Sequence, residues 1–536
     1  MLKLLFAAAI AIQVLISSGD TAELTLWLPG LVIGTIGLLL GDRRHFCVND
    51  FFFILFLVLF VAAPADQIDG RRFLGDISVR GIDFPEHVMV RTVLLADLFA
   101  VCVLMVKLLD WLPVKTSPGR WARGWDVARQ NKKPVFTGEP AVALSAALPT
   151  HEISDDEVLV LDTSEVPSET PSETLSEAPA EAPADHIVEM PTRRRRIMPY
   201  MAAIKQNELN PMATRMQRLL GGFIVVEMLM LLFMTLAMGS TTFILDGRDY
   251  PHRLYENNPA LAVITQAILQ VVPLVGLCVG IVHFQARRSR QAVYWLLALI
   301  VGCLIFNNPF NTARFQFGAY CLMVLLFIFR GHIRSYICYL GLVSYLMVIM
   351  PAMNAIRHAG TGGLGEIGDL SARIDFKQLD YDAFSMFACA VFRTGDNGFA
   401  AGTYTLSVLL FFVPRTLWPN KPLASSIELG QFLMQHHSGW FDNLSCPPFG
   451  DFYMDFGTFG VVCGGLLYGF ILLWADRALR KWEANAFFAC GLAAAVMGFL
   501  PILVRGSLGS VVGGFVVTGL VLMVTSRLMR PTANPK

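Results

Sequence analysis

The chain has 536 residues, of which 54% are hydrophobic and 16% are charged, and its mean hydropathy is +0.54. Soluble proteins carry roughly 25% charged residues, so this composition excludes an ordinary soluble enzyme or a secreted disulfide scaffold and predicts a membrane protein. The 42 basic residues balance the 42 acidic ones, which argues against nucleic acid as a partner.

Apolar runs make up most of the chain outside its middle section. Because a transmembrane helix needs roughly 20 apolar residues, we expect an all-α polytopic integral membrane protein with about 12–14 transmembrane helices. The stretch 380–415 is ambiguous, since its two apolar pieces are short and must cross the membrane twice or not at all. The other predicted spans lie near residues 3–18, 23–41, 49–63, 88–109, 218–239, 260–284, 291–306, 315–330, 334–353, 456–475, 486–504 and 507–527.

Clusters of basic residues between these runs indicate which loops face the cytoplasm. Such residues follow the second run at Arg43 and Arg44, the sixth near Arg288 and the last at Arg527, and cytoplasmic loops carry this excess. We therefore expect both termini in the cytoplasm and the region after Met353 on the outer side.

The middle section, residues 111–217, has a different composition. It carries the acidic tract PSETPSETLSEAPAEAPA between basic ends, and such a sequence buries too little apolar surface to fold. We expect a mostly disordered cytoplasmic linker, while a docking site for a regulatory partner stays open. The predicted divisions are N-terminal transmembrane helices 1–110, the linker 111–217, central transmembrane helices 218–353, an external or re-entrant module 354–455, and C-terminal helices with a cytoplasmic tail 456–536.

The predicted module is rich in polar side chains, and long loops in compact proteins are often functional. It contains FFVPRTLWPNKP at 411–422 and, about 30 residues later, GDFYMDFGTFG at 450–460. Neither the acidic residues nor the cysteines have convincing metal-ligand spacing. We therefore predict no metal and no cofactor.

These two segments resemble the Wzy-type oligosaccharide repeat-unit polymerases of bacterial O-antigen and exopolysaccharide pathways. The likeness covers roughly residues 215–530 and is strongest from Asp380 to Gly460; where such families commonly show Gly-Glu-x-Tyr-x-Asn-Phe-Gly, this chain has GDFYMDFG. The resemblance implies a GT-C-like fold and a glycosyltransferase that polymerises polyprenyl-pyrophosphate-linked oligosaccharides at the periplasmic face of the inner membrane. Implied partners are membrane lipids, chain-length regulators and flippases.

Such chemistry needs permanent cations, because donor and acceptor each carry a lipid pyrophosphate and arginine offers phosphate a planar, bidentate fork. Negative charge develops on the leaving oxygen, and fixed cations stabilise it. We expect Arg415 to do so, and Arg357, Arg393 and Lys421 to bind substrate.

The acceptor hydroxyl needs a general base, for which histidine and carboxylates are the usual choices. Asp451 and His437 are our first candidates, and Glu428 and Asp455 stay open. The predicted substrate-binding set is completed by Trp418, Tyr453 and His436.

Other interpretations of the same residues remain. GDFYMDFG is also compatible with a plain helix start in which Asp451 or Asp455 is favoured by the helix dipole. The alternative functions are an O-antigen ligase-type transferase and a transporter or flippase of the same lipid-linked oligosaccharide, although a transporter would show internal repeats.

Two acidic residues, Asp97 and Glu227, fall near the middle of predicted spans. A charge there costs on the order of 3 kcal/mol, so we expect each to be paired or protonated. Arg91, Arg314 and Arg505 are the possible partners.

Overall fold

A computed structural model places the greater part of the chain outside the middle section. Residues Met1–Pro113 and Ile204–Lys536 form one compact unit. Residues 112–205 of the predicted linker lie outside the described residues. The structure describes residues 2–18, 21–41, 47–69, 72–73, 84–111, 206–244, 254–255, 259–309, 311–345, 376, 379–415, 417–436, 444–482 and 486–529.

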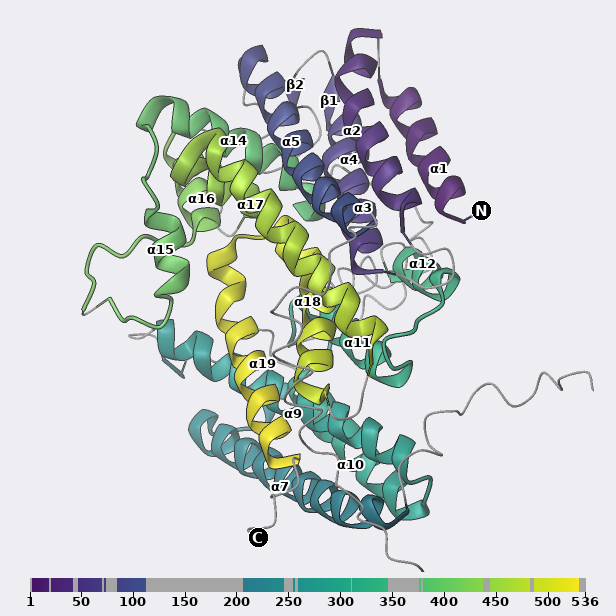
Figure 1. The fold of residues 1–536 in the computed structure, drawn as a ribbon. Coiled ribbons are helices and arrows are strands. Elements are labelled where there is room, and N and C mark those ends of the chain that lie inside the picture. Colours follow the sequence, from purple (N-terminus) through teal and green to yellow (C-terminus); the bar gives the residue numbers. More distant parts are fainter. Residues whose placement is uncertain are drawn as a thin grey trace, which may run out of the picture. The chain divides into compact units, whose positions relative to one another are not determined.

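The predicted all-α polytopic class is confirmed. Each predicted span contains a helix, and the described strands are only β1 (Ile68–Asp69) and β2 (Arg72–Phe73), which pair in antiparallel register. The helices are α1 (Leu2–Ser17), α2 (Thr21–Leu39), α3 (Val48–Leu57), α4 (Ala63–Gln67), α5 (Glu86–Trp111), α7 (Gln206–Met238), α9 (Pro259–Ala286), α10 (Arg290–Phe306), α11 (Arg314–Ile328), α12 (Ser335–Ser344), α14 (Ala383–Asn397), α15 (Thr403–Leu409), α16 (Ser425–His436), α17 (Pro448–Arg480), α18 (Phe487–Arg505) and α19 (Leu508–Met529) (Figure 1).

Apolar helices long enough to cross a bilayer recur along the chain. Within the described residues seven helical stretches meet this criterion, α3 and α4 forming one of them through the π-helical turn Val58–Ala62. Four further apolar helices are shorter. The stretches are Val48–Gln67, Glu86–Leu109, Arg215–Met238, Leu261–Ala286, Pro448–Arg480, Phe487–Arg505 and Leu508–Met529.

Two helices begin before the predicted spans that they contain. Helix α7 begins at Gln206 instead of near 218, because Gln, Glu and Met favour helix and a helix need not end at the edge of its apolar run. Helix α17 begins at Pro448 instead of 456. The ambiguous stretch forms α14 and α15, of 15 and 7 residues, each shorter than the ~30 Å hydrocarbon core at ~1.5 Å per residue.

Helices α5 and α17 approach each other closely because α17 carries glycines on the contact face. A Cβ at Gly465 would lie 2.7 Å from the Cβ of Cys102, and one at Gly469 would lie 2.8 Å from the Cβ of Val106. Small residues four positions apart let two membrane helices pack backbone against backbone. Helix α17 is thereby held against the N-terminal helices (Figure 1).

Charged side chains gather where the helices end. Lys3 at the start of α1 contacts Asp50 at 2.6 Å, and Asp476 near the end of α17 accepts a hydrogen bond from Asn49 at 2.6 Å. Arg314 and Arg505, from the start of α11 and the end of α18, instead contact aspartates that precede α14. Lys3, Asp50 and Asp476 lie near helix ends that we predict on the cytoplasmic side of the membrane. Arg314 and Arg505 lie at helix ends that we predict on the outer side.

Helix α17 is broken at Gly457, which has φ 63° and ψ −146°. The break frees the carbonyl of Met454, and the backbone N–H of Ala400 donates to it at 2.8 Å. The segment GDFYMDFG is thus a short helix followed by a sharp change of direction, and the turn between α14 and α15 packs on the break.

Replacing Gly457 by alanine should destabilise the protein. The backbone there lies in a region that only glycine adopts readily, and an added Cβ would lie 2.9 Å from the ring of Phe399. We expect a loss of about 1–3 kcal/mol, seen as a lower melting temperature in detergent. Gly514→Ala is the matched control, because no atom lies within 4 Å of its Cβ position; equal melting of the two variants would contradict the role of the break.

Candidate functional site

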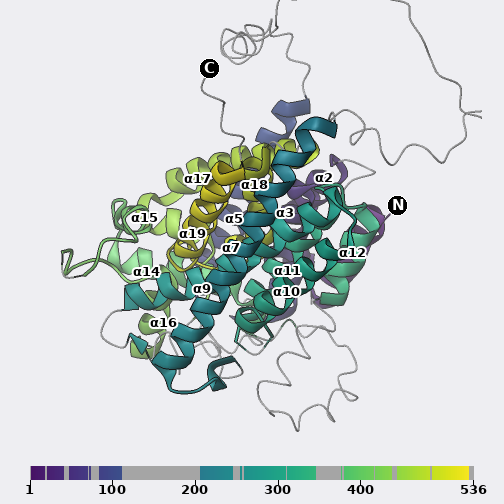
Figure 2. The same ribbon diagram turned by 90° about the horizontal axis from the view of Figure 1, so that it is seen from below.

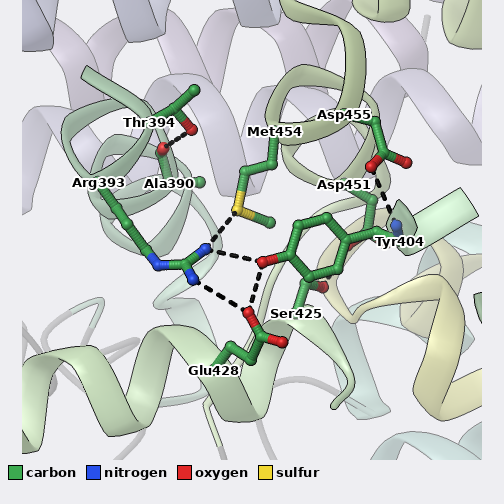
Figure 3. A network of polar contacts seen from close by, with 9 residues as sticks. All are labelled: Ala390, Arg393, Thr394, Tyr404, Ser425, Glu428, Asp451, Met454 and Asp455. Carbon is green, nitrogen blue, oxygen red and sulfur yellow. Dashed lines mark hydrogen bonds and ion pairs between the residues drawn. The ribbon is translucent and has the colours of Figure 1, made fainter. Parts of the chain in front are cut away.

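The first segment of α17 carries two buried aspartates four residues apart, each bound to another helix. Asp455 is 1% exposed and accepts the backbone N–H of Tyr404 at 3.0 Å and that of Thr405 at 2.6 Å, as well as the Thr405 hydroxyl at 2.6 Å. The first N–H groups of a helix have no partner within it. Asp455 therefore caps the start of α15 from outside that helix (Figure 3).

Asp451 connects two further helices, through a backbone N–H of one and a side-chain hydroxyl of the other. Its Oδ2 accepts the backbone N–H of Leu508, the first residue of α19, at 2.9 Å, and its Oδ1 accepts the hydroxyl of Ser425, the first residue of α16. The residue is 3% exposed. Asp451 was our first candidate for the general base, but its geometry is that of a residue that positions helices.

A triad of polar side chains joins α14, α15 and α16. The Arg393 guanidinium donates to the Tyr404 hydroxyl at 2.8 Å and to Glu428 Oε2 at 3.1 Å, and the Tyr404 hydroxyl donates to the same Glu428 oxygen at 2.5 Å (Figure 3). The side chains of Arg393 and Glu428 are 22% and 20% exposed. This Arg–Tyr–Glu triad thus combines a permanent cation, a carboxylate and a phenol within reach of solvent.

Burial raises the pKa of Tyr404, and the hydrogen bond to Glu428 raises it further. The phenol therefore stays protonated at neutral pH and acts as a donor. Sequence analysis had singled out Arg393 and Glu428 but not Tyr404, which lies in an unremarkable GTYTLS segment. Only the packing of α15 against α14 and α16 assigns it a partner.

The cations of the loop 410–424 bind the loop's own backbone. Lys421 Nζ donates to the carbonyls of Leu410, Phe411 and Val413 at 2.9, 2.8 and 3.0 Å, which uses all three of its protons. Burial, and secondarily the neighbouring Arg415, lower the pKa of Lys421.

Arg415 is exposed, and its guanidinium donates to the carbonyls of Lys421 and Pro422 at 2.6 and 3.2 Å. These bonds close the loop into a compact turn. The two predicted cations of this loop therefore have a structural function, and Arg415 alone of the two also faces solvent.

The remaining predicted site residues that the structure describes lie outside the triad. Tyr453 is 2% exposed, and the guanidinium of Arg91 lies 5.4 Å from its ring centre. Trp418 is half-buried in the loop 410–424. His436 ends α16, and its side chain lies outside the described residues, as do His437 and Arg357.

The predicted partners of the two membrane acids are wrong. Arg91 lies on Tyr453, and the other two arginines contact aspartates beside α14, at 2.9 Å for Arg314 with Asp380 and at 2.8 Å for Arg505 with Asp382. A sequence does not reveal these pairs, because the two members of each pair lie far apart along the chain.

Asp97 and Glu227 lie instead against glycines of neighbouring helices. A Cβ at Gly30 would meet an Asp97 carboxyl oxygen at 2.7 Å, and one at Gly302 would clash with the Glu227 carboxyl group. Both acids are buried, at 7% and 5% exposure.

No model of a known protein family, no curated protein and no solved structure matches this chain. Among the residues that the structure describes, no group of three or more His, Cys, Asp and Glu side chains could hold a metal ion. The candidate site therefore rests on its own geometry, and its centre is the Arg–Tyr–Glu triad.

Replacing Asp455 by alanine should loosen the module. The change leaves two N–H groups and a hydroxyl at the start of α15 without an acceptor, and losing a helix cap costs about 1–2 kcal/mol. We expect faster trypsin cleavage after Arg415 in the loop that α15 supports. Asp396→Ala, at an exposed position in α14, is the control; equal cleavage of both variants would show that the cap is dispensable.

Proposed function

We propose that this chain is a membrane glycosyltransferase that polymerises polyprenyl-pyrophosphate-linked oligosaccharide repeat units at the periplasmic face of a bacterial inner membrane. The observation that carries the proposal is that the two segments behind the family resemblance are held together. Asp455 caps the helix that leads into FFVPRTLWPNKP, and Asp451 binds Ser425, just beyond its end. The motifs therefore form one module.

The Arg–Tyr–Glu triad supplies the groups that glycosyl transfer needs. In this reaction the acceptor hydroxyl attacks the anomeric carbon of the donor, the bond from that carbon to the pyrophosphate oxygen breaks, and the hydroxyl proton passes to a base. Glu428 is our proposed base in place of Asp451, because its side chain reaches solvent whereas Asp451 does not.

The departing pyrophosphate gains negative charge, which a fixed cation in a partly dry site stabilises. Arg393 is positioned for this by Tyr404 and Glu428 on two other helices. The exposed guanidinium of Arg415 offers a second cation on the adjoining loop. The protonated Tyr404 donates to Glu428 and so keeps that carboxylate in place beside Arg393.

Deleting the gene in its source organism should distinguish polymerase from ligase and flippase. Loss of a polymerase leaves single lipid-linked repeats on the outer face of the membrane. Loss of a ligase leaves long lipid-linked chains, and loss of a flippase leaves single repeats on the inner face. Extraction of lipid-linked saccharides, with enzymatic probing of intact spheroplasts for sidedness, measures this; either of the last two outcomes would replace our proposal.

Within the triad, Glu428→Gln should slow polymerisation about 100-fold, the usual lower limit for loss of a general base. Arg393→Lys should also slow it strongly, since an ammonium group cannot reproduce the planar fork. Chain formation by the purified protein in liposomes is the measurement. Arg288→Lys, at an exposed position between α9 and α10, is the control; parental rates for both triad variants at normal membrane levels would exclude the triad from catalysis.

A further inference from the structure

An apolar groove of about 300 Å³ lies between α3, α11, α12 and α18, helices that are close together in both views (Figures 1 and 2). Its wall is almost wholly hydrocarbon and aromatic. The groove is accessible from outside the helices, since Leu325 and Phe329 in its wall are 40% and 39% exposed. Residues that represent its four sides are Leu55, Phe315, Phe329, Gly341 and Pro501.

The groove is longer than one leaflet of a bilayer. Along α11 its wall runs from Phe315 to Phe329, and these 14 steps at ~1.5 Å each span roughly 21 Å. Half of a hydrocarbon core of ~30 Å is only ~15 Å. A phospholipid chain belongs to one leaflet, so it would reach along only part of this wall. A longer chain would lie along its whole length.

Two arginines mark one end of the groove. The Arg505 guanidinium lies 4.9 Å from the ring centre of Phe315, and the hydroxyl of Tyr345, another wall residue, donates to the backbone carbonyl of Arg314. Both arginines contact the aspartates beside α14. This end of the groove therefore adjoins α14, which carries Arg393 of the triad.

We propose that the groove binds the polyisoprenoid chain of a lipid phosphate, with the phosphate end at Arg314 and Arg505. The inference rests on the proposed function, because it names where the lipid of that substrate lies. Inside a bilayer, the apolar chain of a lipid gains nothing by leaving other lipid tails for an apolar protein surface. The selectivity of the groove for one lipid must therefore come from fit. Here fit means a groove longer than a leaflet and arginine N–H groups at its end, each guanidinium having five donors to share between a carboxylate and a phosphate.

The first experiment uses full-length protein in phosphatidylcholine nanodiscs with undecaprenyl phosphate that carries a photoreactive group on its chain. We expect crosslinks to peptides of α11 and α12. Unlabelled undecaprenyl phosphate should compete, and dioleoyl phosphatidic acid at the same concentration should not. Equal competition by both would show an ordinary boundary lipid and overturn the proposal, as would crosslinks confined to other helices.

The second experiment fills the groove. Gly341 lies in its wall, and no atom lies within 4 Å of its Cβ position, so Gly341→Phe fits the backbone while its ring occupies the groove. We expect about tenfold less crosslinking. Gly222→Phe is the matched control, because Gly222 also has open space around it and lies on α7, away from the groove wall. Undiminished crosslinking in Gly341→Phe would place the chain elsewhere.

Crosslinking is independent of polymerisation, so the two proposals fail separately. A protein that crosslinks selectively but forms no polymer binds the lipid and has another activity. A protein that forms polymer without selective crosslinking at α11 and α12 is a polymerase whose lipid lies outside this groove.

Discussion

Hydrogen bonds between two buried carboxylates and the starts of three helices are the constraint on which the module depends. A helix start presents unpaired N–H groups and a partial positive charge, and a buried carboxylate is costly unless such donors surround it. Asp455 meets both needs at the start of α15, and Asp451 meets them at the start of α19. Asp451 also accepts the hydroxyl of Ser425 at the start of α16. Removing either carboxylate leaves buried donors without partners.

The position of the triad follows from this arrangement. Arg393, Tyr404 and Glu428 come from three helices, two of which start against the aspartates of α17. The break at Gly457 allows α15 to pack in this position, because a straight α17 would offer no free Met454 carbonyl to the turn that precedes α15. Backbone strain that only glycine tolerates is thus located beside the candidate site, as is common in functional regions.

The same physics organises the rest of the compact unit. Glycines on α17 let α5 approach, and charged pairs lie where helices end, since a charge in the hydrocarbon core is expensive. The pairs that Arg314 and Arg505 make beside α14 connect the central and C-terminal helices to the module. In our proposals this junction is where the lipid and the sugar of one substrate would meet.

The sequence alone determined the all-α membrane class and nearly every helix, because a run of apolar side chains and the cost of an unpaired backbone in lipid allow few other structures. It also singled out Arg393, Glu428 and the two aspartates as polar residues in unusual places. What each aspartate does was decided only in three dimensions: Asp451 and Asp455 lie 57 and 51 positions from Leu508 and Tyr404, which they bind. Tyr404 and the groove were likewise invisible, since partners and cavities depend on how helices pack and not on the pattern of any one of them.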